Sequence, residues 1–96
     1  MDNVVYYNEL YDLYGDLLTE KQRKYFEDYY FNNLSFSEMA DLYGISRNAA
    51  FKQIHIVIKK LDEYEEILKL RQKKIKIYEI LENVPIDIKK KIEEII

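Results

Sequence analysis

The sequence predicts an all-α protein organised around a helix-turn-helix, in which two helices are joined by a tight turn. Apolar side chains recur every three or four residues along most of the chain, as on the buried face of a helix. Glycine and proline, the residues that interrupt helices, number only two and one among 96 residues. Within residues 35–60, a short amphipathic helix, a turn at Gly44 and a longer helix follow one another with the spacing of a helix-turn-helix.

The length and composition predict one small domain. A chain of 96 residues, of which 48% are apolar, can form one core and is too short for two ordinary domains. We expect a helix-turn-helix part of three or four helices (residues 1–68) and a C-terminal helical extension (residues 69–96) within that single domain. The lack of cysteine suits a reducing cytosol. No signal peptide or membrane-spanning run is visible, so we expect a cytoplasmic protein with no membrane insertion.

Two helices are predicted before the helix-turn-helix, over residues 4–14 and from residue 20 to about residue 31. The tyrosines of the first helix are expected to pack as half-buried rings rather than to hold a ligand. The second helix starts with a capping box, in which the Thr19 hydroxyl accepts from the amide of Gln22 and the Gln22 side chain reaches back. Asn32 and Asn33 are expected to end it.

The helix-turn-helix has its own start and stop signals. Ser35 and Glu38 form a second capping box, Gly44 can take the left-handed conformation that ends a helix, and Ser46 caps the helix that follows. Ala40 is the small residue that two steeply crossing helices require at their closest approach. The buried face of the first helix is expected to contain Phe36, Met39, Ala40 and Tyr43, with Ile45 beneath the turn.

The helix that starts after Ser46 is predicted to be too long for a compact monomer. No glycine or proline occurs up to Asn83, and a continuous helix over that stretch would be about 57 Å long. A compact globule of this size has a radius of gyration of only about 12 to 13 Å. An apolar stripe follows the helix, interrupted at Arg71: Ala50, Ile54, Val57, Leu61, Tyr64, Leu68, Ile75 and Tyr78. Either the helix breaks near residues 70–72 and folds back, or it protrudes to a partner. In both cases a homodimer would bury the excess stripe.

A last amphipathic helix is predicted after Pro85, which stops the preceding one. Five isoleucines form its apolar face: Ile86, Ile88, Ile92, Ile95 and Ile96. Lys89, Lys90 and Lys91 are expected to form a solvated surface rather than a phosphate site.

The sequence contains no recognisable catalytic constellation. His55 is the only histidine, the serines lie at helix starts where capping explains them, and no glycine-rich phosphate loop is present. The acidic residues are scattered along helix faces. We therefore expect no enzyme activity, metal site, cofactor or small-molecule substrate.

A nucleic-acid interface is predicted at the start of the helix after Gly44. Behind the cap Ser46, the exposed first two turns would present Arg47, Asn48, Phe51, Lys52 and His55. Arginine can bind guanine and asparagine can bind adenine. Lys52 would contact phosphate. Ser35 and Ser37, at the start of the preceding helix, offer a hydroxyl and free amides to a phosphate.

Charge gives this interpretation only partial support. The net charge of −3 opposes phosphate binding. Residues 1–45 have nine acidic and three basic side chains, whereas residues 46–96 have nine acidic and twelve basic ones and include the predicted recognition helix. The alternative is an ordinary tri-helical scaffold with a polar surface.

The segment LYDLYGDLLTEKQRKYFEDYYFNNLSFSEMADLYGISRNAAF (residues 10–51) resembles the YlxM family of small bacterial helix-turn-helix proteins, which are similar to region 4 of sigma factors. The likeness is closest at residues 17–19, 21–23 and 29–30, at Ser35, Glu38 and Ala40, and at Ser46, Arg47 and Ala49. It continues more weakly through residues 61–65. The resemblance implies a regulatory protein that takes part in or regulates the signal recognition particle pathway, with components of that particle as partners, and it carries over no established biochemical activity.

The sequence departs from the family pattern along the long helix. Where the family often has a valine and then a charged stretch, this chain has Ala50 and, further on, residues 55–58 with three apolar side chains. We expect Ile56 and Ile58 to face solvent, which suits a protein contact better than DNA. The predicted dimer or partner interface comprises Ile56, Ile58, Leu61, Tyr64, Leu68, Ile75 and Tyr78.

Three binding hypotheses follow. The first is a DNA-binding regulator. The second is a protein–protein interaction module of the targeting machinery without DNA binding. The third, binding to the particle's RNA, has less support because few aromatic rings would be free to stack on bases.

Overall fold

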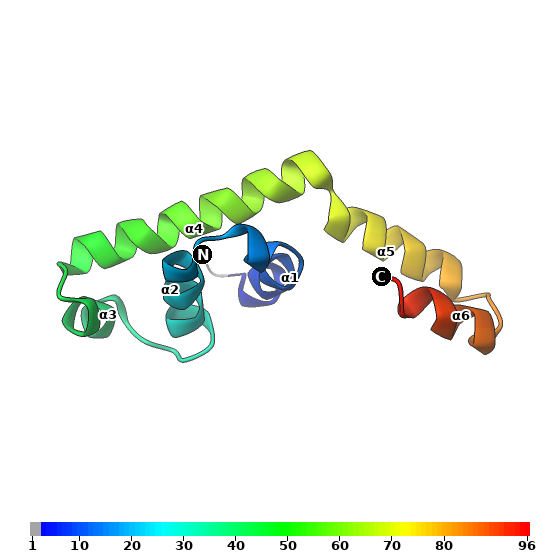
Figure 1. Ribbon diagram of the computed structural model, residues 1–96, viewed down its shortest axis with the longest axis horizontal. Coiled ribbons are helices and arrows are strands. Elements are labelled where there is room, and N and C mark those ends of the chain that lie inside the picture. Colours follow the sequence, from blue (N-terminus) through cyan, green and yellow to red (C-terminus); the bar gives the residue numbers. More distant parts are fainter. Residues whose placement is uncertain (1–2) are drawn as a thin grey trace.

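The computed structural model describes residues 3–96, which form six α-helices, one short 3₁₀ turn and no strand (Figure 1). The predicted all-α fold is confirmed. The elements, in chain order, are α1 (Val4–Tyr14), the 3₁₀ turn Gly15–Leu17, α2 (Glu20–Tyr30), α3 (Phe36–Tyr43), α4 (Arg47–Leu68), α5 (Leu70–Leu81) and α6 (Ile86–Glu93). Helices α1, α2 and α3 lie along one side of α4, and α5 and α6 extend beyond its C-terminal end (Figure 1).

Capping side chains set the starts of α2 and α3, as predicted. The Thr19 hydroxyl accepts from the amide of Gln22 at 3.1 Å, and the Gln22 side chain accepts from the amide of Thr19 at 3.0 Å. Ser35 and Glu38 make the same reciprocal pair, with both distances 3.0 Å. Gly44 ends α3 in the left-handed conformation, with φ of 66°. The expected helix boundaries are therefore confirmed in this half of the chain.

The core is formed between α4 and the three helices beside it. The first part of the predicted apolar stripe, from Ala50 through Ile54 and Val57 to Leu61, is completely buried. Side chains from the other helices cover it: Leu10, Tyr14, Tyr25, Phe26 and Met39. Most of the stripe on α4 is thus buried within the chain itself and needs no partner.

This packing corrects one expectation about the predicted interface. Ile58 is only 6% exposed, so the expectation that it faces solvent is wrong. Leu61 is fully buried, and Tyr64 is half-buried with its ring 5.9 Å from that of Tyr14. The physical reason is that α1–α3 cover a wider arc of α4 than a narrow stripe requires. The remaining predicted interface residues are exposed: Ile56, Leu68, Ile75 and Tyr78.

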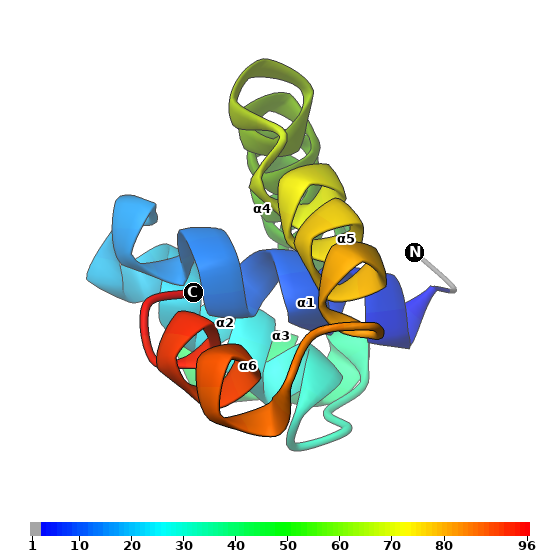
Figure 2. The ribbon, with the colours of Figure 1, turned by 90° about the vertical axis from the view of Figure 1, so that its right-hand side faces the viewer.

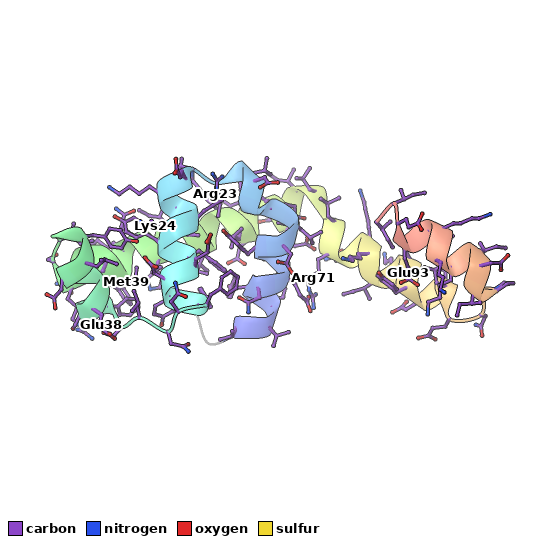
Figure 3. The ribbon with its side chains drawn as sticks, turned by 60° about the horizontal axis from the view of Figure 1, so that its bottom comes forward. Arg23, Lys24, Glu38, Met39, Arg71 and Glu93 are labelled. Carbon is purple, nitrogen blue, oxygen red and sulfur yellow. The ribbon has the colours of Figure 1, made fainter. Side chains whose placement is uncertain are left out.

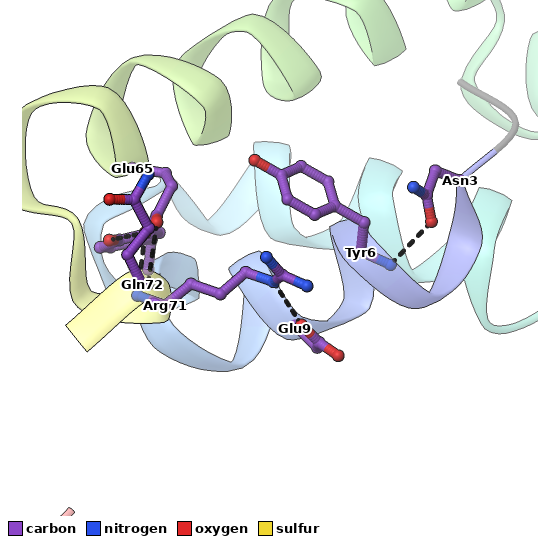
Figure 4. Close-up of polar contacts among 7 residues, drawn as sticks. Asn3, Tyr6, Glu9, Glu65, Arg71 and Gln72 are labelled. Carbon is purple, nitrogen blue, oxygen red and sulfur yellow. Dashed lines mark hydrogen bonds and ion pairs between the residues drawn. The ribbon is translucent and has the colours of Figure 1, made fainter. Parts of the chain in front are cut away.

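The long helix breaks at Lys69, one residue before the predicted interval. Lys69 has φ of 56°, in the left-handed region. The carboxylate of Glu65 accepts hydrogen bonds from the amides of Arg71 and Gln72 at 3.0 and 3.3 Å and so caps the start of α5 (Figure 4). The break does not fold the chain back onto its core. The molecule measures 53 × 25 × 23 Å and has a radius of gyration of 16.6 Å, larger than a compact globule of this length.

Helices α5 and α6 form the end of the molecule that lies farthest from α3 (Figure 1), and this end faces the viewer in Figure 2. Pro85 precedes α6, and the amide of Val84 donates to the carbonyl of Leu81 in the turn between the two helices. None of the helices within residues 3–96 has the length and low charge that crossing a membrane requires.

Candidate nucleic-acid interface

Helices α3 and α4 form the predicted helix-turn-helix. Met39 is fully buried beneath α3, and Ala40 on the same helix is also buried. Figure 3 shows Glu38 and Met39 at this end of the molecule, Arg71 near its middle and Glu93 at the opposite end. The helix-turn-helix therefore lies far from the α5–α6 end, with the length of α4 between them.

The first turns of α4 carry exposed cations. The Ser46 hydroxyl accepts from the amide of Ala49 at 3.0 Å and fixes the start of the helix. Arg47, Asn48, Lys52 and His55 are all exposed. Among residues 3–96 the single ion pair joins Arg71 to Glu9, so neither the Arg47 guanidinium nor the Lys52 ammonium is neutralised there. Both are available to an anionic ligand.

Charge changes sign along α4. Residues 47–60 contain four cations (Arg47, Lys52, Lys59 and Lys60) and no carboxylate. The next exposed side chains are acidic: Asp62, Glu63 and Glu66. A phosphate backbone is therefore favoured along about 20 Å of the helix and opposed beyond that point.

An aromatic row links the exposed face of α4 to the core. Phe51 is 42% exposed, and its ring lies 5.3 Å from that of Phe36 and 4.2 Å from that of His55. Phe36 stacks in turn on Tyr29 at 4.9 Å. Phe36, Phe51, Arg47 and Asn48 line a hollow of about 240 Å³. These contacts hold the exposed Phe51 ring in place beside the polar side chains.

The predicted phosphate contacts at the start of α3, from Ser35 and Ser37, are less available than the cations of α4. The Ser35 hydroxyl already accepts from the Glu38 amide, while the Glu38 carboxylate accepts from the Ser35 amide. Hydrogen bonds from the Ser35 backbone amide and from its side chain lower the pKa of Glu38. A negative charge thus sits at this helix start and opposes a phosphate there. Ser37 is exposed on the first turn of α3.

The structure brings the predicted residues of α4 together on one surface. Ser35 and Ser37 are exposed and flank Phe36 in the sequence, and the Phe36 ring contacts that of Phe51. The sequence pattern predicts Phe36 as a core residue, and its contact with the exposed Phe51 is visible only in the structure. Five cations within residues 69–76 were not among the predicted site residues, although this run of basic residues is visible in the sequence. In the described part of the chain, no three His, Asp or Glu side chains lie close enough to hold a metal ion.

Comparison with known proteins places these features in a family context. The whole chain, residues 1–96, matches the UPF0122 family, described as "Putative helix-turn-helix protein, YlxM / p13 like". It is 44% identical to a UPF0122 protein of Shouchella clausii over 73 residues, which cover 76% of this chain and 67% of the relative. It is 42% identical to a UPF0122 protein of Halalkalibacterium halodurans over 84 residues, which cover 88% of this chain and 77% of the relative. A Bacillus cereus relative is 46% identical over 66 residues, which cover 69% of this chain and 60% of the relative.

Proposed function

Because the chain belongs to the UPF0122 family of YlxM/p13-like helix-turn-helix proteins, we propose that it is a DNA-binding regulator whose recognition surface is the start of α4. The observation that carries this proposal is the segment of residues 47–60, which contains four cations and no carboxylate, and within residues 3–96 no ion pair involves its exposed Arg47 or Lys52. In a helix-turn-helix complex the second helix enters the major groove and the first crosses the backbone. The arrangement of α4 and α3 is suited to those two positions.

Three exposed side chains at the start of α4 have a chemical partner in the major groove. Arg47 can donate two hydrogen bonds to guanine, and Asn48 can pair with adenine. Phe51 offers an apolar surface to the methyl group of thymine, and its aromatic neighbours support it in that position. Lys52 and Lys59 suit phosphate contacts, which set affinity rather than sequence preference.

The binding test is a salt titration. With a labelled duplex in fluorescence anisotropy, the logarithm of the binding constant should fall linearly with the logarithm of salt concentration, by about 0.9 per phosphate contacted. Arg47→Ala should weaken binding by about tenfold or more. Lys24→Ala, which removes an exposed cation on α2, serves as the matched control. Binding that does not respond to salt or to Arg47→Ala would refute the proposal.

A second candidate function has support at the other end of the molecule. Exposed apolar side chains at the end of α4 and on α5, among them Leu68, Ile75 and Tyr78, suit a protein contact. A role in the signal recognition particle pathway would use such a contact with a component of the particle. A pull-down with the particle's purified protein and RNA, with duplex DNA as competitor, distinguishes the two functions. Failure to retain either component would reject the second.

We also propose that the working form is a homodimer. Ile56, Leu68, Ile75 and Tyr78 remain exposed and support a self-contact, whereas Ile58 and Leu61 do not because they are buried. The surfaces that would form this dimer are argued below.

A further inference from the structure

The α5–α6 pair has almost no core of its own. Within residues 70–96, Leu81 is the only buried side chain. Three isoleucines of this stretch are mostly exposed: Ile80 at 69%, Ile86 at 70% and Ile95 at 84%. Helices of 12 and 8 residues are too short to be stable in water by themselves. This end of the chain therefore has apolar surface that packing against another surface would stabilise.

A groove of about 420 Å³ lies between α1 and α5, and we call it the acidic groove. Apolar side chains line part of it: Leu13, Ile75 and Tyr78. Four carboxylates line the rest, from Glu9 and Asp12 of α1 and from Glu79 and Glu82 of α5. Only two cations accompany them, and Arg71 is already paired with Glu9 at 2.5 Å. The groove thus suits an amphipathic helix with a basic surface.

Helix α6 has the matching properties. It carries Lys89, Lys90 and Lys91 in succession against two carboxylates, Asp87 and Glu93, so it has a small net positive charge, and Ile86 and Ile88 are exposed on it. From Arg71 to Glu82, α5 rises about 16 Å along the groove, and the eight residues of α6 span about 12 Å. The length of the groove therefore accommodates this helix.

Helix α6 does not fill the groove of its own chain. It lies beneath the far half of α5 (Figure 1), and no residue of α6 is among those that line the groove. The short turn at residues 82–85, closed by the bond from Val84 to Leu81, holds α6 in that position. A second copy of the chain can supply the helix that the groove lacks.

We propose that two copies of the chain pair by placing α6 of each in the acidic groove of the other. The contact is made twice around a two-fold axis, so each chain gives a basic helix and receives one. The contact buries exposed apolar side chains and brings opposite charges together. It leaves the start of α4 free at the other end of each chain. This pairing rests on the homodimer proposed above and is independent of DNA binding.

The test is a charge exchange between two variants. K90E/K91E makes α6 acidic and E79K/E82K makes the groove basic, and all four positions are exposed, so both variants should keep the helical circular dichroism of the native chain. Sedimentation of the native chain should give twice 11.7 kDa. Each variant alone should have its dimer dissociation constant raised about 100-fold or more, because like charges then face each other. An equimolar mixture should restore the dimer, because both contacts again join opposite charges.

The control and the contrary outcomes are distinct. E63K/E66K makes the same charge change on α4 outside the groove and should remain dimeric. A native chain that sediments as a monomer would overturn both the pairing and the homodimer. A native dimer that both variants retain, or that the mixture fails to restore, would overturn the pairing alone. Duplex affinity, measured separately, decides the DNA proposal without affecting either result.

Discussion

The hydroxyl of Tyr14 donates a hydrogen bond to Oε1 of Glu65 across 2.6 Å, and both side chains are buried. The same hydroxyl accepts from the amide of Leu70 at 3.1 Å, while Glu65 accepts from the next two amides of α5. One side chain from α1 and one from α4 therefore satisfy the free amides at the start of α5. The direction in which α5 leaves the core depends on this pair.

Removing the Glu65 carboxylate should destabilise the chain. Glu65→Ala leaves the Tyr14 hydroxyl and two amides without an acceptor, which should lower the free energy of unfolding by about 3 kcal/mol. Urea unfolding followed by circular dichroism measures the difference. Glu66→Ala, at the exposed neighbouring position, should change it by less than about 0.5 kcal/mol. Equal effects at the two positions would show that the buried network contributes nothing.

Stability should also fall in acid through Glu65. Burial alone would raise the pKa of this carboxyl, but hydrogen bonds from Tyr14 and from the amides of Arg71 and Gln72 lower it below the ordinary 4.5. A carboxyl whose pKa is lower in the folded state stabilises the fold above pH 4.5, and the contribution is lost as the pH falls through the folded value. Urea unfolding at a series of pH values should show a steeper loss below 4.5 in the native chain than in Glu65→Gln. Parallel curves would refute the assignment.

The break at Lys69 predicts an unusual effect of glycine. A lysine with φ of 56° carries a left-handed penalty of about 1 kcal/mol, which glycine avoids. Lys69→Gly should therefore raise the free energy of unfolding. The net gain should be about 0.5 kcal/mol, because glycine also makes the unfolded chain more flexible and that cost is subtracted. Lys73→Gly, within α5, should lower it by about 1 kcal/mol. The opposite signs of the two changes in urea unfolding are the result to look for.

Phe51 should read a thymine methyl group. In a duplex that the chain binds, replacing thymidine by deoxyuridine under this ring removes one methyl group, worth about 0.8 kcal/mol or roughly fourfold in affinity. Phe51→Ala should bind the two duplexes equally. Anisotropy with both proteins and both duplexes gives the four values that are needed. If replacing any thymidine in the site changes the affinity of the native chain and of Phe51→Ala equally, Phe51 has a role other than base recognition.

Local chemistry explains why so much of the fold was predictable. The capping pairs at Thr19 and Ser35 and the left-handed Gly44 act over three or four residues, so their effects are readable from sequence. The break at Lys69 is different, because it depends on Tyr14, which lies 56 residues away in sequence from the Leu70 amide that it caps. No local signal marks Lys69 as a helix end. The burial of Ile58 likewise depends on how widely α1–α3 wrap α4.

The candidate interface was predictable in residue type but not in arrangement. Helical spacing placed Arg47, Asn48 and Lys52 on the exposed turns of α4, where they are found. Sequence could not show that Phe36, assigned to the core, would also support Phe51. That contact forms between two helices, and its geometry follows from their crossing rather than from either segment alone.

The length of α4 has a consequence for any DNA site that two copies would share. Its 22 residues span about 33 Å, with the recognition turn at one end and the Lys69 break at the other. In a dimer joined through α5 and α6, the length of this rigid helix sets the distance between the two recognition turns and therefore the spacing of the two half-sites. Four residues inserted into its middle would add about 6 Å and rotate the recognition turn by about 40°. Operator spacing, as well as base sequence, would then decide which sites both copies can occupy together.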